Sequence, residues 1–176
     1  WRKHRPAHLR FVRDVGQRPL GHARVVFERH GAHAVAVVEV THCADEHRAG
    51  KESRESVRQW VSQNQVTALP NVVFFDSAEF VSSYQLIQRS KFVMIYNSTI
   101  GLEAAILGMP VLCAGRARFT QLPTVFFPQS SAAYCQQLEE FLVADQVVAL
   151  PEFQVNARRF LYYQLYRSSL PFGDFL

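Results

Sequence analysis

Polar residues that could bind an anion follow a buried apolar stretch near the middle of the chain. Residues 92–95 are apolar, as in a strand covered on both faces, and Asn97, Ser98 and Thr99 come shortly afterwards. Hydroxyl groups, unpaired backbone N–H groups and the positive end of a helix dipole together attract an anion such as a phosphate. The pattern predicts a phosphate-binding turn. It leaves open an ordinary strand–helix crossover in which the hydroxyls only cap the helix.

Two residues in the following helix extend this candidate site. Gly101 lies in the first helical turn, where a missing side chain lets a ligand approach the backbone. Glu103 can accept a hydrogen bond from a ribose hydroxyl, or it is simply a favourable charge near the helix start. Gly108 and Pro110 end the helix before the next strand.

Strand and helix patterns alternate from residue 34 onward. Strands are predicted at residues 34–40, 72–75, 92–96, 111–114 and 124–127. Helices are predicted at residues 52–63, 82–88 and 100–107, from Ser130 or Ser131, and from Pro151. The alternation predicts an α/β fold: a Rossmann-like parallel sheet with helices on both faces.

Two further candidates lie after other predicted strands. His42 follows the strand at 34–40, and Ser83 opens the helix after the strand at 72–75. Ligands bind beyond the carboxyl ends of parallel strands, so both residues should lie at the same sheet edge as Ser98. The alternatives are an exposed loop histidine and a helix-capping serine.

The charge distribution separates the first 33 residues from the rest. The chain carries a net charge of +4, yet residues 1–30 hold eight Lys or Arg against two acidic residues. We expect a basic, poorly defined segment at 1–33 and one Rossmann-like domain at 34–176. No aromatic platform for bases interrupts the basic residues, so nucleic acid is not an expected partner. The start at Trp1 lacks an apolar signal region and suggests a fragment boundary.

Several kinds of site have no signal in this sequence. There is no Asp-x-Asp pair, so no metal ion is expected at a diphosphate, and no cofactor motif occurs. The three cysteines lack metal-ligand spacing, and Cys113 is expected to be a small core residue. No carboxylate stands out as a general base, so the catalytic residues stay unknown.

The chain resembles the C-terminal domain of bacterial capsule-polysaccharide glycosyltransferases with the GT-B fold, the group that contains Kdo transferases. The resemblance rests on the string Ser98-Thr99-x-Gly101-x-Glu103-Ala104, followed by Gly108-x-Pro110-Val111. Other matching pieces follow the family's order, at residues 50–57, 82–84, 123–128 and Tyr134. The resemblance covers roughly residues 35–176.

This resemblance implies one half of a metal-independent glycosyltransferase of capsule or surface polysaccharide biosynthesis. The half would bind a nucleotide-sugar through Ser98, Thr99, Gly101, Glu103, His42 and Ser83. A CMP-sugar is the expected donor, and a UDP-sugar is the alternative. The family often has His-Pro where this chain has His42-Cys43. The acceptor would be a glycan or glycolipid, and the base would come from an N-terminal GT-B domain that this chain is expected to lack. The domain alone should therefore be inactive. We expect it in the cytoplasm, where it can lie at the inner face of the cytoplasmic membrane.

Two alternatives from other classes remain. One is a nucleotide-sugar 2-epimerase-like domain, although that family prefers Ser-Gly-Gly where this chain has Ser98-Thr99-Ile100-Gly101. The other is a non-catalytic interaction domain of Rossmann type, for which a hydroxyl-rich turn would be unnecessary.

Overall fold

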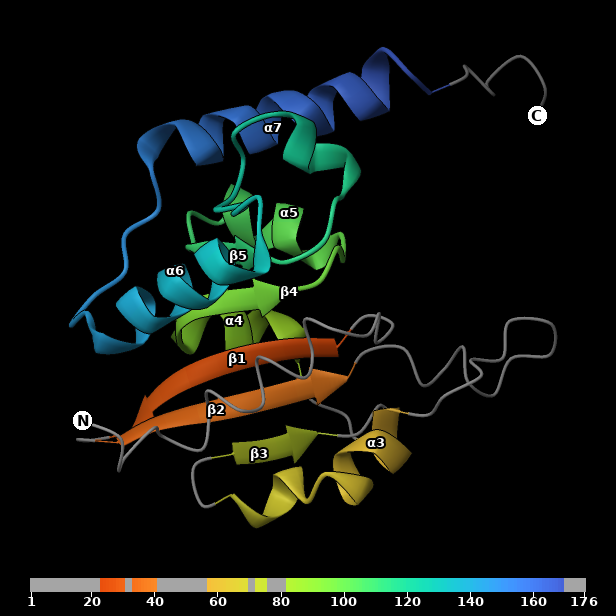
Figure 1. Cartoon of the computed structure of the whole chain (residues 1–176). Coiled ribbons are helices and arrows are strands. Elements are labelled where there is room, and N and C mark those ends of the chain that lie inside the picture. Colours follow the sequence, from red (N-terminus) through yellow and green to blue (C-terminus); the bar gives the residue numbers. More distant parts are fainter. Residues whose placement is uncertain (1–22, 31–32, 41–56, 70–71, 76–81, 170–176) are drawn as a thin grey trace, which may run out of the picture.

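A computed structural model of the chain describes residues 23–30, 33–40, 57–69, 72–75 and 82–169 (Figure 1). Its strands are β1 (Ala23–His30), β2 (His33–Val40), β3 (Val72–Phe75), β4 (Ser90–Ile95) and β5 (Val111–Cys113). Its α-helices are α3 (Val57–Gln63), α4 (Ser83–Arg89), α5 (Ile100–Ile106), α6 (Ser131–Val143) and α7 (Pro151–Tyr166). Two short 3₁₀ helices complete it, η1 (Val66–Ala68) and η2 (Arg118–Gln121).

The described strands form one mixed sheet in the order β3-β2-β1-β4-β5 (Figure 1). The pairs β2–β3 and β4–β5 are parallel, whereas β1 is antiparallel to both β2 and β4. Strands β2, β3, β4 and β5 therefore all run in one direction. The α/β fold is confirmed, and the expectation of an all-parallel sheet is wrong for β1 alone. The direction of a strand in a sheet depends on the strands with which it pairs. The residues of β1 alone do not indicate those partners.

Strand β1 lies in the middle of the sheet. It pairs with β2 along its whole length, from Ala23 opposite Val40 to His30 opposite His33. Such close sequence neighbours form an antiparallel hairpin. The sheet therefore begins on the N-terminal side of the boundary expected after residue 33.

Helices cover both faces of the sheet, as predicted, and β4 shows this most directly. Alternate residues of β4 point to opposite faces. Phe92 and Met94 pack with Leu138 and Phe141 of α6. The intervening residues Val93 and Ile95 belong to a second cluster, with buried residues from α4, α5 and α7: Ile87, Ala104 and Ala157. Burial on both faces explains the continuous apolar run of this strand.

The two C-terminal helices begin where the sequence predicts. The Ser130 hydroxyl accepts a hydrogen bond from the Ala133 amide at 3.2 Å and caps α6. Pro151 occupies the first turn of α7. Phe153 and Ala157 of α7 are buried, whereas Leu165 near its end is exposed. Leu161 is exposed as well, and so are the tyrosines of this helix: Tyr162, Tyr163 and Tyr166.

Candidate functional site

The strand order places a topological switch point beside β1. From β2 the chain crosses to β3 on one side, and from β4 it crosses to β5 on the other side. In α/β sheets, ligands bind outside the carboxyl ends of the strands at such a point. Val38 and Met94 both pair with Val25, so the ends of β2 and β4 reach the same level of the sheet. With β1 between them, they lie about two strand spacings apart, roughly 9–10 Å.

The turn after β4 carries two hydroxyls that do not cap the helix. Thr99 occupies the N-cap position of α5 with helical dihedral angles (φ −62°, ψ −21°), and its side chain makes no capping hydrogen bond. Ser98 is only 6% exposed, and its hydroxyl has no hydrogen-bond partner among the described residues. The backbone carbonyls of Ser98 and Thr99 instead accept from the amides of Gly101 at 3.1 Å and Leu102 at 2.9 Å. The crossover is therefore closed by backbone bonds, and within the described residues neither hydroxyl takes part in a hydrogen bond.

Helix α5 contributes a weaker dipole at this turn than the sequence suggests. Helix α5 has only seven residues, from Ile100 to Ile106. A macrodipole is the sum of aligned peptide dipoles, so a helix of two turns supplies a small one. The side-chain hydroxyls, rather than the helix dipole, are therefore the groups of this turn best suited to attract an anion.

Gly101 is explained by packing against the core. It is buried, and an added Cβ would lie 2.2 Å from Ile95 Cδ1 and 3.5 Å from Phe119 Cζ. Protein side chains fill the space that a side chain of Gly101 would need, so the close contact of α5 with β4 and η2 is by itself a steric reason for a glycine here. Its predicted contact with a ligand stays a prediction.

Glu103 is held by a tyrosine from the neighbouring helix. The Tyr84 hydroxyl donates a hydrogen bond to Glu103 Oε2, which joins the start of α4 to the first turn of α5. The Tyr84 side chain is 52% exposed. Its polar end is used in this contact, so Tyr84 joins the candidate site through Glu103. The adjacent Ser83 is half-buried and opens α4, which brings it to the same group of elements.

Tyr96 and Gly115 are in close contact at the sheet edge beside the turn. The Gly115 amide donates to the Tyr96 carbonyl at 2.6 Å, and a Cβ on Gly115 would lie 2.9–3.0 Å from the Tyr96 ring. The Cys113 thiol lies beneath and donates to the carbonyls of both residues at 3.1 Å. Burial raises the pKa of this thiol from 9.0 to about 12, so it stays neutral. Cys113 is confirmed as a buried core residue.

His42 lies outside the described residues, so its predicted contact with the ligand stays a prediction. The described part of the chain contains no group of three His, Cys, Asp or Glu side chains that could hold a metal ion. None of its helices is both long and apolar enough to cross a membrane.

Comparison with known proteins identifies one match. The model of a family described as "Capsule polysaccharide biosynthesis protein" matches residues 25–123 of the 176 residues. The match begins in β1, includes the whole turn between β4 and α5, and ends at Pro123. No curated protein and no solved structure matches the chain.

Proposed function

The chain belongs to the family of capsule polysaccharide biosynthesis proteins, and from this premise we propose that it binds the nucleotide-sugar donor of a metal-independent glycosyltransferase. The observation that carries the proposal is the Ser98 hydroxyl, which is buried at the switch point without a partner in the described structure. Leaving a buried hydroxyl unpaired costs about 1–3 kcal/mol. A phosphate oxygen of a ligand would satisfy it. The donor we expect is a CMP-sugar.

Each residue of the turn has a chemical task in this proposal. Transfer breaks the bond between the sugar's anomeric carbon and a phosphate oxygen, so negative charge grows on the departing nucleotide. Hydroxyl donors from Ser98 and Thr99 would stabilise that charge without a cation. Glu103, oriented by Tyr84, would accept hydrogen bonds from the ribose hydroxyls.

The remaining tasks require groups beyond this turn. The acceptor, a glycan or glycolipid, must lose a proton as its oxygen attacks the sugar, and no base is recognisable in the turn. We assign the base and the other wall of the cleft to a second GT-B lobe. His42 and Ser83 complete the proposed donor contacts. The reaction would take place in the cytoplasm, at the inner face of the membrane.

Calorimetric titration of CMP, UDP and their sugar conjugates into the chain tests the donor site. We expect saturable binding of the cytidine compounds that is unchanged by EDTA. Preferred binding of the uridine compounds would overturn the choice of donor, and binding of none of them would overturn the donor site itself. Loss of binding in EDTA would contradict the metal-independent mechanism.

The variant Thr99→Val tests the turn directly. It should leave the free energy of unfolding within about 0.5 kcal/mol, since Thr99 is exposed and makes no capping bond. Loss of a hydrogen bond to a charged phosphate should weaken nucleotide binding by about 1.5–3 kcal/mol. Thr67→Val, at an exposed position in η1, is the matched control and should bind normally. Equal nucleotide affinity of the Thr99→Val and Thr67→Val variants would show that the Thr99 hydroxyl does not bind the ligand.

A further inference from the structure

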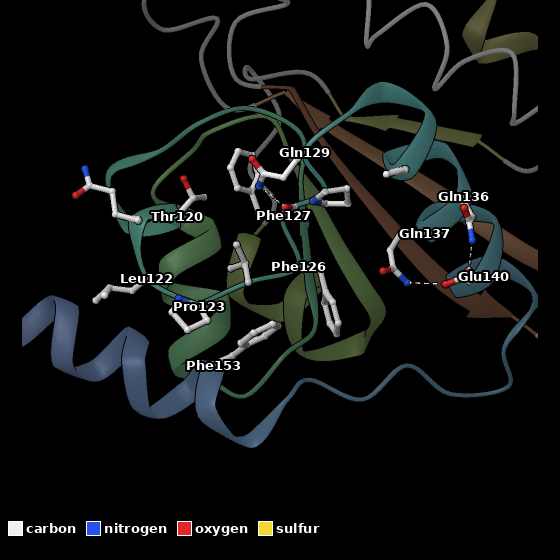
Figure 2. A pocket seen from close by; sticks show the side chains of 14 residues that line it. Thr120, Leu122, Pro123, Phe126, Phe127, Gln129, Gln136, Gln137, Glu140 and Phe153 are labelled. Carbon is white, nitrogen blue, oxygen red and sulfur yellow. Dashed lines mark hydrogen bonds between the residues drawn. The ribbon is translucent and has the colours of Figure 1, made fainter.

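A second concave region lies away from the turn, between α6, the start of α7 and the segment that follows η2. It is an open pocket of about 580 Å³, within the size range of small-molecule sites (Figure 2). Phe126, Phe127 and Phe153 contribute aromatic rings to its lining, whereas Gln136, Gln137 and Glu140 of α6 stand on its other side. The pocket thus has one apolar side and one polar side.

The hydrogen bonds of the polar side determine what it offers a ligand. Gln136 Nε2 donates to Glu140 Oε1 at 3.1 Å, and Gln137 Nε2 donates to Glu140 Oε2 at 2.9 Å (Figure 2). Gln129 Nε2 donates to the Phe127 carbonyl at 2.9 Å. An ionised carboxylate and a carbonyl can only accept, so each amide must turn its NH₂ group toward them. The amide oxygens of the glutamines and the carboxylate remain for the ligand as acceptors, and each glutamine NH₂ group keeps its second N–H as a donor.

The apolar side is made of aromatic rings that pack against one another. Phe126 packs edge-on against Phe153, with ring centroids 5.0 Å apart, and in the same way against Phe141, also at 5.0 Å. Phe153 is almost fully buried and anchors this side of the pocket. Ordered aromatic rings of this kind offer a preorganised surface to the C–H face of a flat ligand.

A ligand that suits both sides has many hydroxyl donors, an apolar face and no negative charge. Nucleotides and acidic sugars fail the last condition, because Glu140 would repel them and no Lys or Arg is among the described residues that line the pocket. We propose that the pocket binds a neutral pyranose unit of a glycan chain. This site is separate from the nucleotide turn and does not depend on it.

The pocket and the turn share one supporting segment. Phe119, in η2, packs against Gly101 below the turn, and Thr120, the next residue, lines the pocket. The Thr124 hydroxyl donates to the Phe119 carbonyl at 2.8 Å and holds this segment together. A glycan in the pocket would therefore lie on the same segment that supports the turn.

Two adjacent alanines at the start of α6 allow a matched test. Ala133 lines the pocket, whereas Ala132 is exposed and does not line it. We would titrate neutral disaccharides of glucose, galactose and N-acetylglucosamine into the whole chain, using saturation-transfer NMR, with urea unfolding as the check on folding. At least one should bind, and Ala133→Trp should weaken it by about tenfold or more, equal to about 1.4 kcal/mol. Ala132→Trp should bind like the wild type.

Two further measurements test whether the pocket disfavours a charged sugar and whether it binds independently of the nucleotide turn. Glucuronic acid should bind about fivefold more weakly than glucose, as expected for a carboxylate close to Glu140 in water. Ser98→Ala should bind saccharides normally, so failure of the nucleotide site and failure of this proposal are distinguishable. No binding of any neutral disaccharide, equal binding by both tryptophan variants, or preference for glucuronic acid would each overturn the proposal.

Discussion

Replacing Ser98 with alanine should move stability and affinity in opposite directions. In the free protein, the Ser98 hydroxyl is buried and has no partner in the described structure, so its desolvation is not compensated. Removing it should raise the free energy of unfolding by about 1 kcal/mol. In the complex the same hydroxyl would donate to a charged phosphate. Its loss should therefore cost about 1.5–3 kcal/mol of nucleotide affinity, roughly ten- to a hundredfold.

A second buried serine supplies the matched control. Ser90 is 8% exposed, but its hydroxyl donates to the Ile87 carbonyl at 2.7 Å. Ser90→Ala should therefore lower the free energy of unfolding by about 1 kcal/mol and leave nucleotide affinity unchanged. Urea unfolding measures the stability of both variants, and calorimetry with CMP measures affinity. A loss of stability in Ser98→Ala would show that the hydroxyl has a partner within the protein. Unchanged affinity would refute its role in binding phosphate.

The remaining predictions concern the surroundings of the turn. Gly101→Ala should destabilise the fold by about 1–3 kcal/mol in urea unfolding, because its Cβ would meet Ile95 Cδ1; Ile95→Val removes that atom, so the double variant should lose less than the sum of the single losses. Tyr84→Phe should weaken CMP binding by about 1 kcal/mol in calorimetry, because Glu103 loses the hydrogen bond that orients it; an unchanged affinity would separate this pair from the ligand. Above pH 9 the free energy of unfolding should fall, because the Cys113 thiol ionises near 9.0 when unfolded and near 12 when folded. Cys113→Ser keeps a donor that does not titrate and should reduce this pH dependence; an equal slope in both proteins would assign it to other groups.

Features that depend on neighbouring residues could be predicted from the sequence. The apolar run of β4, the breakers Gly108 and Pro110, and the serine before α6 locate their elements to within one or two residues. These signals work because helix ends and buried strands are governed by backbone sterics and local hydrogen bonds. The α/β class follows from the same alternation.

The tertiary structure decided everything that depends on which distant segments meet. It turned β1 antiparallel in the middle of the sheet and joined Tyr84 to Glu103 across two helices. It also put Ile95 where a side chain of Gly101 would lie, which gives this glycine a packing role that the sequence did not indicate. The same residue type received opposite roles: the Ser130 hydroxyl caps its helix, whereas the Ser98 hydroxyl is buried and has no partner among the described residues. Residue type determines which bonds a side chain can form, but burial and distance, set by long-range contacts, determine which of them it does form.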